Sequence, residues 1–113
     1  MTQQPSALTA AEFQVLLALA DGEKHGYAIG KEIAARTDGK VELRAATLYT
    51  VIKRLLANGF IDEDVARPDP ELDDERRRYY RLTMRGRRAA EDEVRRLEAT
   101  AKQARTKLRL RKA

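Results

Sequence analysis

Residues 45–59 read Ala-Ala-Thr-Leu-Tyr-Thr-Val-Ile-Lys-Arg-Leu-Leu-Ala-Asn-Gly and are the most informative segment of this 113-residue chain. One side of their helical wheel collects the apolar residues expected of a buried face, namely Leu48, Val51, Ile52 and Leu55. The opposite side is small, hydroxylic and basic, with Tyr49 at its flank, and holds Ala46, Thr47, Thr50, Lys53 and Arg54. We therefore predict an amphipathic helix from about Ala45 to Ala57, ended by Asn58-Gly59.

Two further helices are predicted before this segment. Thr9 and Glu12 have the spacing of a capping box, and Leu8 and Phe13 have that of a hydrophobic staple. This first helix ends at Asp21-Gly22, and its buried stripe is predicted to contain Phe13, Leu16, Leu17 and Ala20. A second helix is predicted from about Tyr27 to Thr37, ended by Asp38-Gly39, with inward residues Ile29, Ile33 and Ala34.

After Gly59 the hydrophobic period changes to that of β-strands. Residues 60–66 and 77–82 are predicted to form the two strands of a hairpin, with Tyr80 and Leu82 on one face. The connector at residues 67–75 contains two prolines, which exclude regular pairing. Val41 to Leu43 fits a further short extended piece. Thr83 then caps a long final helix.

The final helix carries a heptad seam of mostly small residues, which are Gly86, Ala90, Val94, Leu97, Ala101, Ala104 and Leu108. A helix of roughly 25 residues is about 38 Å long and would extend beyond a small three-helix core. We therefore predict a homodimer, although a helix folded back on its own domain is the alternative. The predicted interface consists of Phe13, Leu16, Leu17, Ala90, Val94, Leu97, Ala101, Ala104 and Leu108.

Three helices, a β-hairpin and a long last helix are the parts of a winged helix-turn-helix protein. We predict a mainly α fold with a small β-hairpin. Residues 1–82 would form a winged helix-turn-helix DNA-binding domain, and residues 83–113 a C-terminal dimerisation helix with a basic tail. In this arrangement the third helix enters the major groove of DNA.

The charge distribution favours a nucleic-acid partner. Residues 1–75 hold 8 Lys/Arg and 14 Asp/Glu, whereas residues 76–113 hold 15 Lys/Arg and 4 Asp/Glu. Seven arginines occupy the thirteen positions from Arg76 to Arg88. Such a basic block can bind phosphate backbones, but a solvated helix face has the same composition.

The composition disfavours several other classes of function. The chain has no Cys and one His, which excludes disulfides and thiolate metal sites and disfavours His-based metal sites and triads. It also has no Gly-rich phosphate loop and no nucleophile elbow, so we expect no enzymatic activity, no cofactor and no metal. Without a 20-residue apolar span or a secretion signal, we expect a cytoplasmic protein with no membrane partner. A winged-helix module that binds another protein instead of DNA remains the alternative.

Four motifs follow one another along residues 8–88 at compatible spacing. They are His25-Gly26-Tyr27-Ala28-Ile29; Thr47-Leu48-Tyr49 with Arg54-Leu55 and Gly59-Phe60-Ile61; Arg78-Tyr79-Tyr80-Arg81-Leu82-Thr83; and Gly86. This succession resembles the PadR family of bacterial transcriptional regulators, in its compact form with a single C-terminal dimerisation helix.

The resemblance implies a homodimer that binds double-stranded DNA at a palindromic operator and represses transcription. The DNA-binding residues that it implies are Tyr27, on phosphate; Thr47, Tyr49, Thr50 and Lys53, in the groove; and Arg76, Arg77 and Arg78, on the wing. Arg44 begins the third helix, whose N-terminus favours a phosphate. Arg54 ranks lower because Glu63 or Asp64 could pair with it. The acidic wing tip, Asp69 to Glu75, departs from the family pattern, since DNA would repel it.

The resemblance also implies a small apolar or phenolic effector that binds between the helices of the dimer and releases the DNA. Its candidate surface consists of Phe13, Leu16, Leu17, Val94, Leu97 and Ala101. A plain dimer core accounts for the same residues, and no Trp is present to stack on a ring. We interpret His25 as a hydrogen-bond donor at the start of the second helix.

Overall fold

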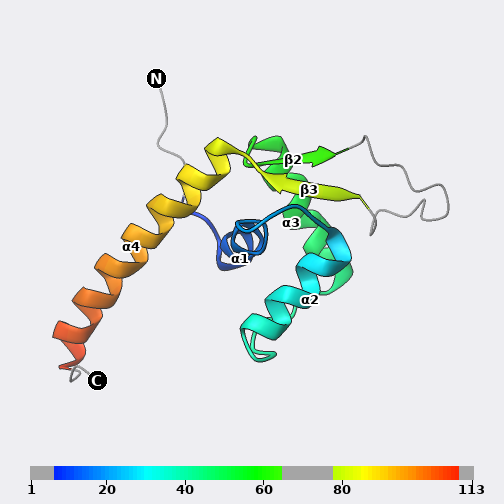
Figure 1. The fold of residues 1–113 in the computed structure, drawn as a ribbon. Coiled ribbons are helices and arrows are strands. Elements are labelled where there is room, and N and C mark those ends of the chain that lie inside the picture. Colours follow the sequence, from blue (N-terminus) through cyan, green and yellow to red (C-terminus); the bar gives the residue numbers. More distant parts are fainter. Residues whose placement is uncertain (1–6, 65–77, 110–113) are drawn as a thin grey trace.

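The computed structural model describes residues 7–64 and 78–109, which form a helical domain with one long projecting helix (Figure 1). The helices of this part of the chain are α1 (Ala10–Ala18), α2 (Gly26–Arg36), α3 (Ala45–Ala57) and α4 (Met84–Leu108). Its strands are β1 (Lys24–His25), β2 (Ile61–Asp64) and β3 (Tyr79–Leu82). The predicted mainly α fold with a small β-hairpin is thus confirmed, and a third strand extends the hairpin to a small antiparallel sheet.

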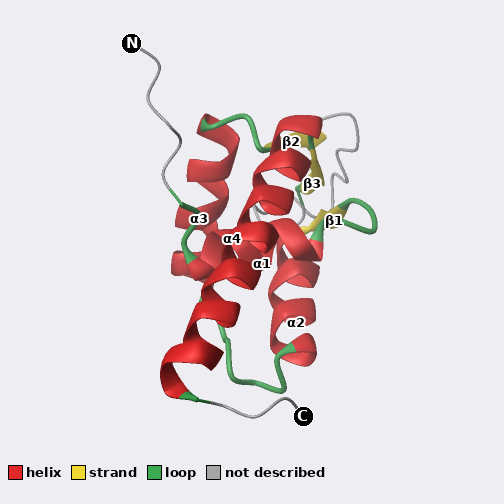
Figure 2. Cartoon of the chain, turned by 90° about the vertical axis from the view of Figure 1, so that its left-hand side faces the viewer, coloured by secondary structure: helices red, strands yellow, loops and turns green. Residues whose placement is uncertain are grey.

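Helix α1 lies in the middle of the domain, where it packs against α2, α3 and α4 (Figures 1 and 2). Its capping box forms as predicted, with Glu12 N–H donating to Thr9 Oγ1 at 3.1 Å and Thr9 N–H donating to Glu12 Oε1 at 2.8 Å. The predicted buried stripe is confirmed only in part, with Leu16 buried and Phe13 and Leu17 half-buried, because neighbours cover α1 on several sides. Its most buried apolar residues are Val15, Leu16 and Ala18, followed by the C-cap residue Leu19. Ala20 is exposed.

Helices α2 and α3 complete the core. Ile29 and Ile33 of α2 are fully buried, and α3 buries its four predicted apolar residues, Leu48, Val51, Ile52 and Leu55. The bounds of α3 match the prediction, whereas α2 begins and ends one residue earlier than predicted. The turn after α2 uses left-handed backbone at Asp38 (φ 53°) and Gly39 (φ 76°).

The sheet has three strands in the order β1-β3-β2, all antiparallel. The predicted hairpin forms, with Ile61 opposite Leu82, although residues 65–77 lie outside the described part of the chain. The third strand was not predicted, because two residues are too few to show an alternating pattern. It comes from Lys24–His25, whereas residues 41–43 take no part in the sheet.

In the described part of the chain, helix α4 is anchored on the domain through its N-terminal half. Thr83 Oγ1 accepts the Gly86 N–H at 3.0 Å and donates to the Gly59 carbonyl at 2.7 Å, which fixes the first turn on the domain. Ala89 and Ala90 pack on the core, and the helix then projects away from it (Figure 1). Beyond them, Val94, Leu97 and Leu108 are 41%, 48% and 67% exposed. In the described ranges, no helix is both long and apolar enough to cross a bilayer.

Candidate nucleic-acid interface

The outward face of α3 is exposed along its whole length. All five side chains predicted for this face are exposed in the structure: Ala46, Thr47, Thr50, Lys53 and Arg54. Arg44 is also exposed and precedes α3 as its N-cap residue, but its side chain makes no capping hydrogen bond. The positive end of the α3 dipole therefore lies beside an exposed guanidinium group, an arrangement that attracts anions.

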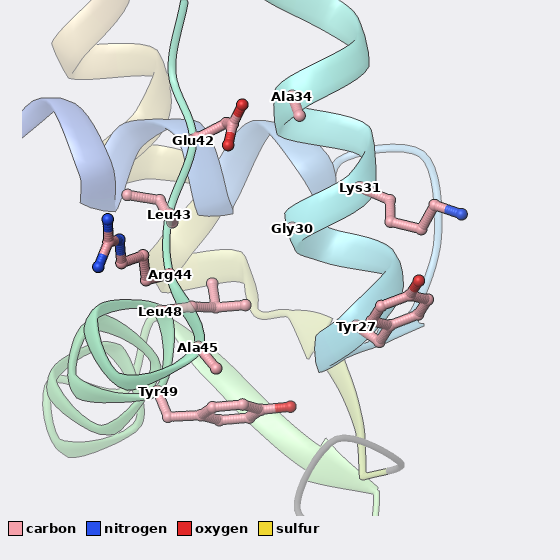
Figure 3. Close-up of a pocket in the computed structure, with 10 residues that line it drawn as sticks. All are labelled: Tyr27, Gly30, Lys31, Ala34, Glu42, Leu43, Arg44, Ala45, Leu48 and Tyr49. Carbon is pink, nitrogen blue, oxygen red and sulfur yellow. The ribbon is translucent and has the colours of Figure 1, made fainter. Parts of the chain in front are cut away.

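A cleft of about 370 Å³ lies between α2 and the start of α3 (Figure 3). It is lined by Tyr27, Gly30, Lys31, Ala34, Glu42, Leu43, Arg44, Ala45, Leu48 and Tyr49. Tyr27, predicted to contact phosphate, is 56% exposed at one end of this cleft. Lys31 Nζ lies 5.3 Å from the centre of the Tyr27 ring. Sequence reasoning missed Lys31, although its position four residues after Tyr27 on α2 places it on the same helix face.

Tyr49 has a different position from its predicted neighbours on the groove-facing surface. Its side chain is half-buried and extends towards α2, where Gly26 leaves room for its ring (Figure 3). A Cβ atom on residue 26 would lie 2.9 Å from Tyr49 Cε1, closer than real contacts allow. Tyr49 therefore packs α3 against α2 instead of projecting with Thr47 and Thr50.

His25 connects α2 with the sheet. Its Nδ1 accepts the Ala28 N–H at 3.1 Å, so the imidazole caps α2 as an acceptor, and our interpretation of it as a donor is wrong. The His25 ring stacks on the Tyr27 ring, with the ring centroids 6.3 Å apart. It contacts the Tyr79 ring edge-on, with the centroids 5.6 Å apart. The His25 backbone also pairs with Tyr79. One residue thus contacts both the helix that carries Tyr27 and the wing strand β3.

The capping role of His25 predicts a specific pattern of stability. His25→Ala should lower the free energy of unfolding by about 1 kcal/mol, because it removes the α2 N-cap acceptor. His25→Asn should recover most of that loss, because Asn supplies an acceptor at the same position. Urea unfolding followed by circular dichroism measures both changes. Equal stabilities for the Ala and Asn variants would contradict the capping role.

Ion pairs hold the turn between α1 and β1 against α2. Lys24 Nζ donates to Asp21 Oδ1 at 2.6 Å and lies 3.3 Å from Glu32 Oε1 on α2. The hydrogen bond from Lys24 and its positive charge hold the pKa of the Asp21 carboxyl below its usual range. These contacts help to fix the position of β1, and hence of His25.

The wing is only partly described. Arg76, Arg77 and the acidic tip at residues 69–75 lie outside the described residues. Arg78 is exposed at the start of β3, and its Nη1 lies 3.0 Å from Glu63 Oε2 on β2. Glu63 was one of two acids expected to pair with Arg54. Its pairing with Arg78 offsets part of the positive charge that the wing could present.

The residues predicted for a dimer interface fall into three groups. Val94, Leu97, Ala101 and Leu108 are exposed on α4, and Phe13, Leu17, Ala90 and Ala104 are partly buried. Leu16 is 1% exposed, because it lies in the core of the single chain. It has no surface for a second chain, so its assignment to the interface and to the effector surface is corrected.

Comparisons with known proteins place this architecture in a family. The model of the transcriptional regulator PadR-like family matches residues 15–92. An uncharacterized protein of Lysinibacillus sphaericus is 33% identical over 75 residues, which make up 64% of this chain and 63% of that relative's length. The structure of a transcriptional regulator from Clostridium thermocellum is similar over 85% of this chain and 87% of that one, at 29% identity and a TM-score of 0.72.

Two other solved structures share this fold. Bacillus subtilis PadR, solved in complex with operator DNA, matches 74% of this chain and 46% of its own, at 23% identity and a TM-score of 0.64. Bordetella bronchiseptica BpsR, whose DNA binding is regulated by 6-hydroxynicotinic acid, matches 92% of this chain and 70% of its own, at 31% identity and a TM-score of 0.66. The fold, the order of the motifs and the family match together show that this chain belongs to the PadR-like family of transcriptional regulators.

Proposed function

We propose that this chain is a homodimeric, sequence-specific DNA-binding repressor that binds a palindromic operator. The observation that carries this proposal is the exposed face of α3, which combines small and hydroxylic side chains with Lys53 and Arg54. Small and hydroxylic groups suit base edges in the major groove, and basic groups suit phosphates. The complex of Bacillus subtilis PadR with operator DNA supports DNA as the partner.

In this proposal the elements around α3 hold the DNA backbone. Tyr27 and Arg44, at the N-terminal ends of α2 and α3, would contact phosphates, and Arg78 would anchor the wing together with Arg76 and Arg77. Tyr49 would act indirectly, since its ring sets the spacing between α2 and α3. Residues 1–82 would be the DNA-binding domain, and residues 83–113 the dimerisation helix.

A second copy of the chain would cover the exposed apolar side of α4. Val94, Leu97 and Leu108 leave apolar side chains exposed along one side of this helix. Phe13 and Leu17 are half-buried on α1, which packs against α4 and could extend the same surface. A two-fold dimer would place two copies of α3 on two half-sites, which accounts for a palindromic operator.

We extend the proposal to control by a small apolar or phenolic effector bound between the helices of the dimer. The regulation of BpsR by 6-hydroxynicotinic acid supports this extension. The expected surface is now Phe13 and Leu17 of α1 with Val94, Leu97 and Ala101 of α4, without Leu16.

A gel shift with DNA from immediately upstream of the coding region is the first test. A discrete complex that resists nonspecific competitor and weakens with salt is expected. If only diffuse, fully competed binding appears, selection of genomic fragments would search for an operator elsewhere. Failure of both experiments would contradict DNA binding and favour a winged-helix module that binds protein.

Substitution of Lys53 tests quantitatively whether α3 lies against the DNA. Lys53→Ala should weaken operator binding and make the log–log salt dependence shallower by about 0.9, the contribution of one phosphate contact. Lys102→Ala, which removes the same charge from an exposed site on α4, should leave the slope unchanged. Fluorescence anisotropy between about 50 and 200 mM salt measures both. Equal slopes for the two variants would contradict the placement of α3 on DNA.

A further inference from the structure

The exposed face of α3 is divided into two chemically different halves. Its N-terminal half presents Ala46, Thr47 and Thr50, and its C-terminal half presents Lys53 and Arg54. Thr47 and Lys53 are six positions apart, which corresponds to about 9 Å along the helix axis. The methyl-bearing side chains and the cations can therefore contact different parts of one ligand.

Thr50 is constrained by a hydrogen bond within its own helix. Its Oγ1 donates to the Ala46 carbonyl at 2.9 Å while the side chain stays exposed. A hydroxyl group has one hydrogen to donate, and that hydrogen is used here. While this hydrogen bond is kept, Thr50 offers an incoming base its γ-methyl group and the lone pairs of Oγ1. Ala46 offers a methyl group alone.

Among the four bases, only thymine carries a methyl group in the major groove, at C5 of its ring. Ala and Thr side chains contact this group through their own methyl groups, whereas Asn or Gln reads adenine and Arg or Lys reads guanine. Residues near the N-terminus of a recognition helix are the ones that contact base edges. In this chain the first turns of α3 carry methyl groups, on Ala46, Thr47 and Thr50, and no amide side chain, and the guanidinium group of Arg44 lies just before the helix.

We propose that Ala46, Thr47 and Thr50 select thymine in each operator half-site by contact with its 5-methyl group, with Thr50 as a specificity-determining residue. This inference rests on the proposed binding of DNA through α3. Lys53 and Arg54, farther along the helix, then contact the phosphate backbone. Because 5-methylcytosine carries its methyl group at the same ring position, it substitutes for thymine in this contact.

The test uses the duplex that the intact protein selects from a random pool. Each thymine is replaced in turn by deoxyuridine, which keeps the base pairing and lacks only the 5-methyl group. At one or two positions per half-site, wild-type affinity should fall about four-fold, the factor that corresponds to ~0.8 kcal/mol for one buried methyl group. Equal affinity for the thymine and deoxyuridine duplexes at every position would overturn the inference.

Two variants of Thr50 separate its methyl group from its hydroxyl group. Thr50→Ser keeps the hydroxyl and loses the methyl, so it should bind the selected duplex about four-fold more weakly and lose sensitivity to deoxyuridine at one position. Thr50→Val keeps a methyl group and loses the hydroxyl, so it should remain sensitive there. If Thr50→Ser kept its sensitivity to deoxyuridine at that position and Thr50→Val lost it, the role of Thr50 would be overturned. Thr100→Ser, on the exposed surface of α4, controls for general effects of the exchange.

The two proposals fail in different ways. A selected, salt-sensitive duplex that tolerates deoxyuridine everywhere leaves DNA binding intact and overturns only the reading of thymine. If no duplex is selected from the pool, DNA binding through α3 is overturned, and the reading of thymine with it.

Discussion

Gly86→Ala is expected to lower the free energy of unfolding by about 2–4 kcal/mol, because it forces extra volume between two backbone segments. The first turn of α4 crosses directly over the carbonyl group of Phe60. A Cβ atom on residue 86 would lie 2.8 Å from the Phe60 carbonyl carbon and 2.9 Å from Leu82 Cδ1. The Phe60 oxygen also accepts the Thr83 N–H at 3.1 Å, so a shift that relieved the clash would disturb this bond.

Gly30→Ala is the matched control for this effect. Gly30 lies in α2, and a Cβ atom there would make an ordinary contact of 3.5 Å with Leu48 Cδ2. Ala in a helix interior is favoured over Gly by about 0.5–1 kcal/mol, so this variant should be as stable as wild type or more so. Urea unfolding followed by far-UV circular dichroism measures both variants. If Gly86→Ala and Gly30→Ala lowered the free energy of unfolding by similar amounts, the close crossing of α4 over Phe60 would not require Gly86.

Leu97→Asp is expected to dissociate the proposed dimer and thereby abolish operator binding. Leu97 is 48% exposed in the single chain and lies midway along the apolar side of α4. A carboxylate buried without a partner costs several kcal/mol, and a two-fold dimer contains the substitution twice. We therefore expect dimer affinity to fall by about 100-fold or more, while the monomer stays helical. Analytical ultracentrifugation and circular dichroism measure these two properties.

Gln103→Asp separates disruption of the interface from a general effect of charge. Gln103 is exposed on the opposite side of α4, and its substitution adds the same charge to the same helix. This variant should remain dimeric and bind the operator as the wild type does. A dimer that survives Leu97→Asp would mean that the two chains associate elsewhere.

The helical period of a sequence predicts the buried residues best where a helix meets the core on one side only. The buried residues of α3 were predicted from its helical period, since one face packs inward and the other is exposed. The same reasoning misjudged α1, which is covered by three helices and has no single buried stripe. Strand β1 was missed because its stability comes from pairing with β3, which lies more than fifty residues away in the sequence.

In the candidate interface, too, the helical period predicts exposed positions but not contacts with other elements. Thr47, Thr50 and Lys53 were placed on the exposed face of α3 by their helical spacing alone. The half-burial of Tyr49 could not be predicted in this way, because it depends on the space that Gly26 leaves on another helix. His25 was recognised as a helix-start residue, but whether it donates or accepts depends on the orientation of its ring.

The central position of β3 has a mechanical consequence. This strand is hydrogen-bonded on both edges and leads into α4 through the single residue Thr83, which is itself bonded to the Gly59 carbonyl. Thr83 is the single residue between β3 and α4, so a rotation of α4 is passed directly to the strand. In the proposed dimer, a small tilt of α4 against its partner would therefore displace β3 and β2 together with α3, which contacts β2, and would change the distance between the two copies of α3.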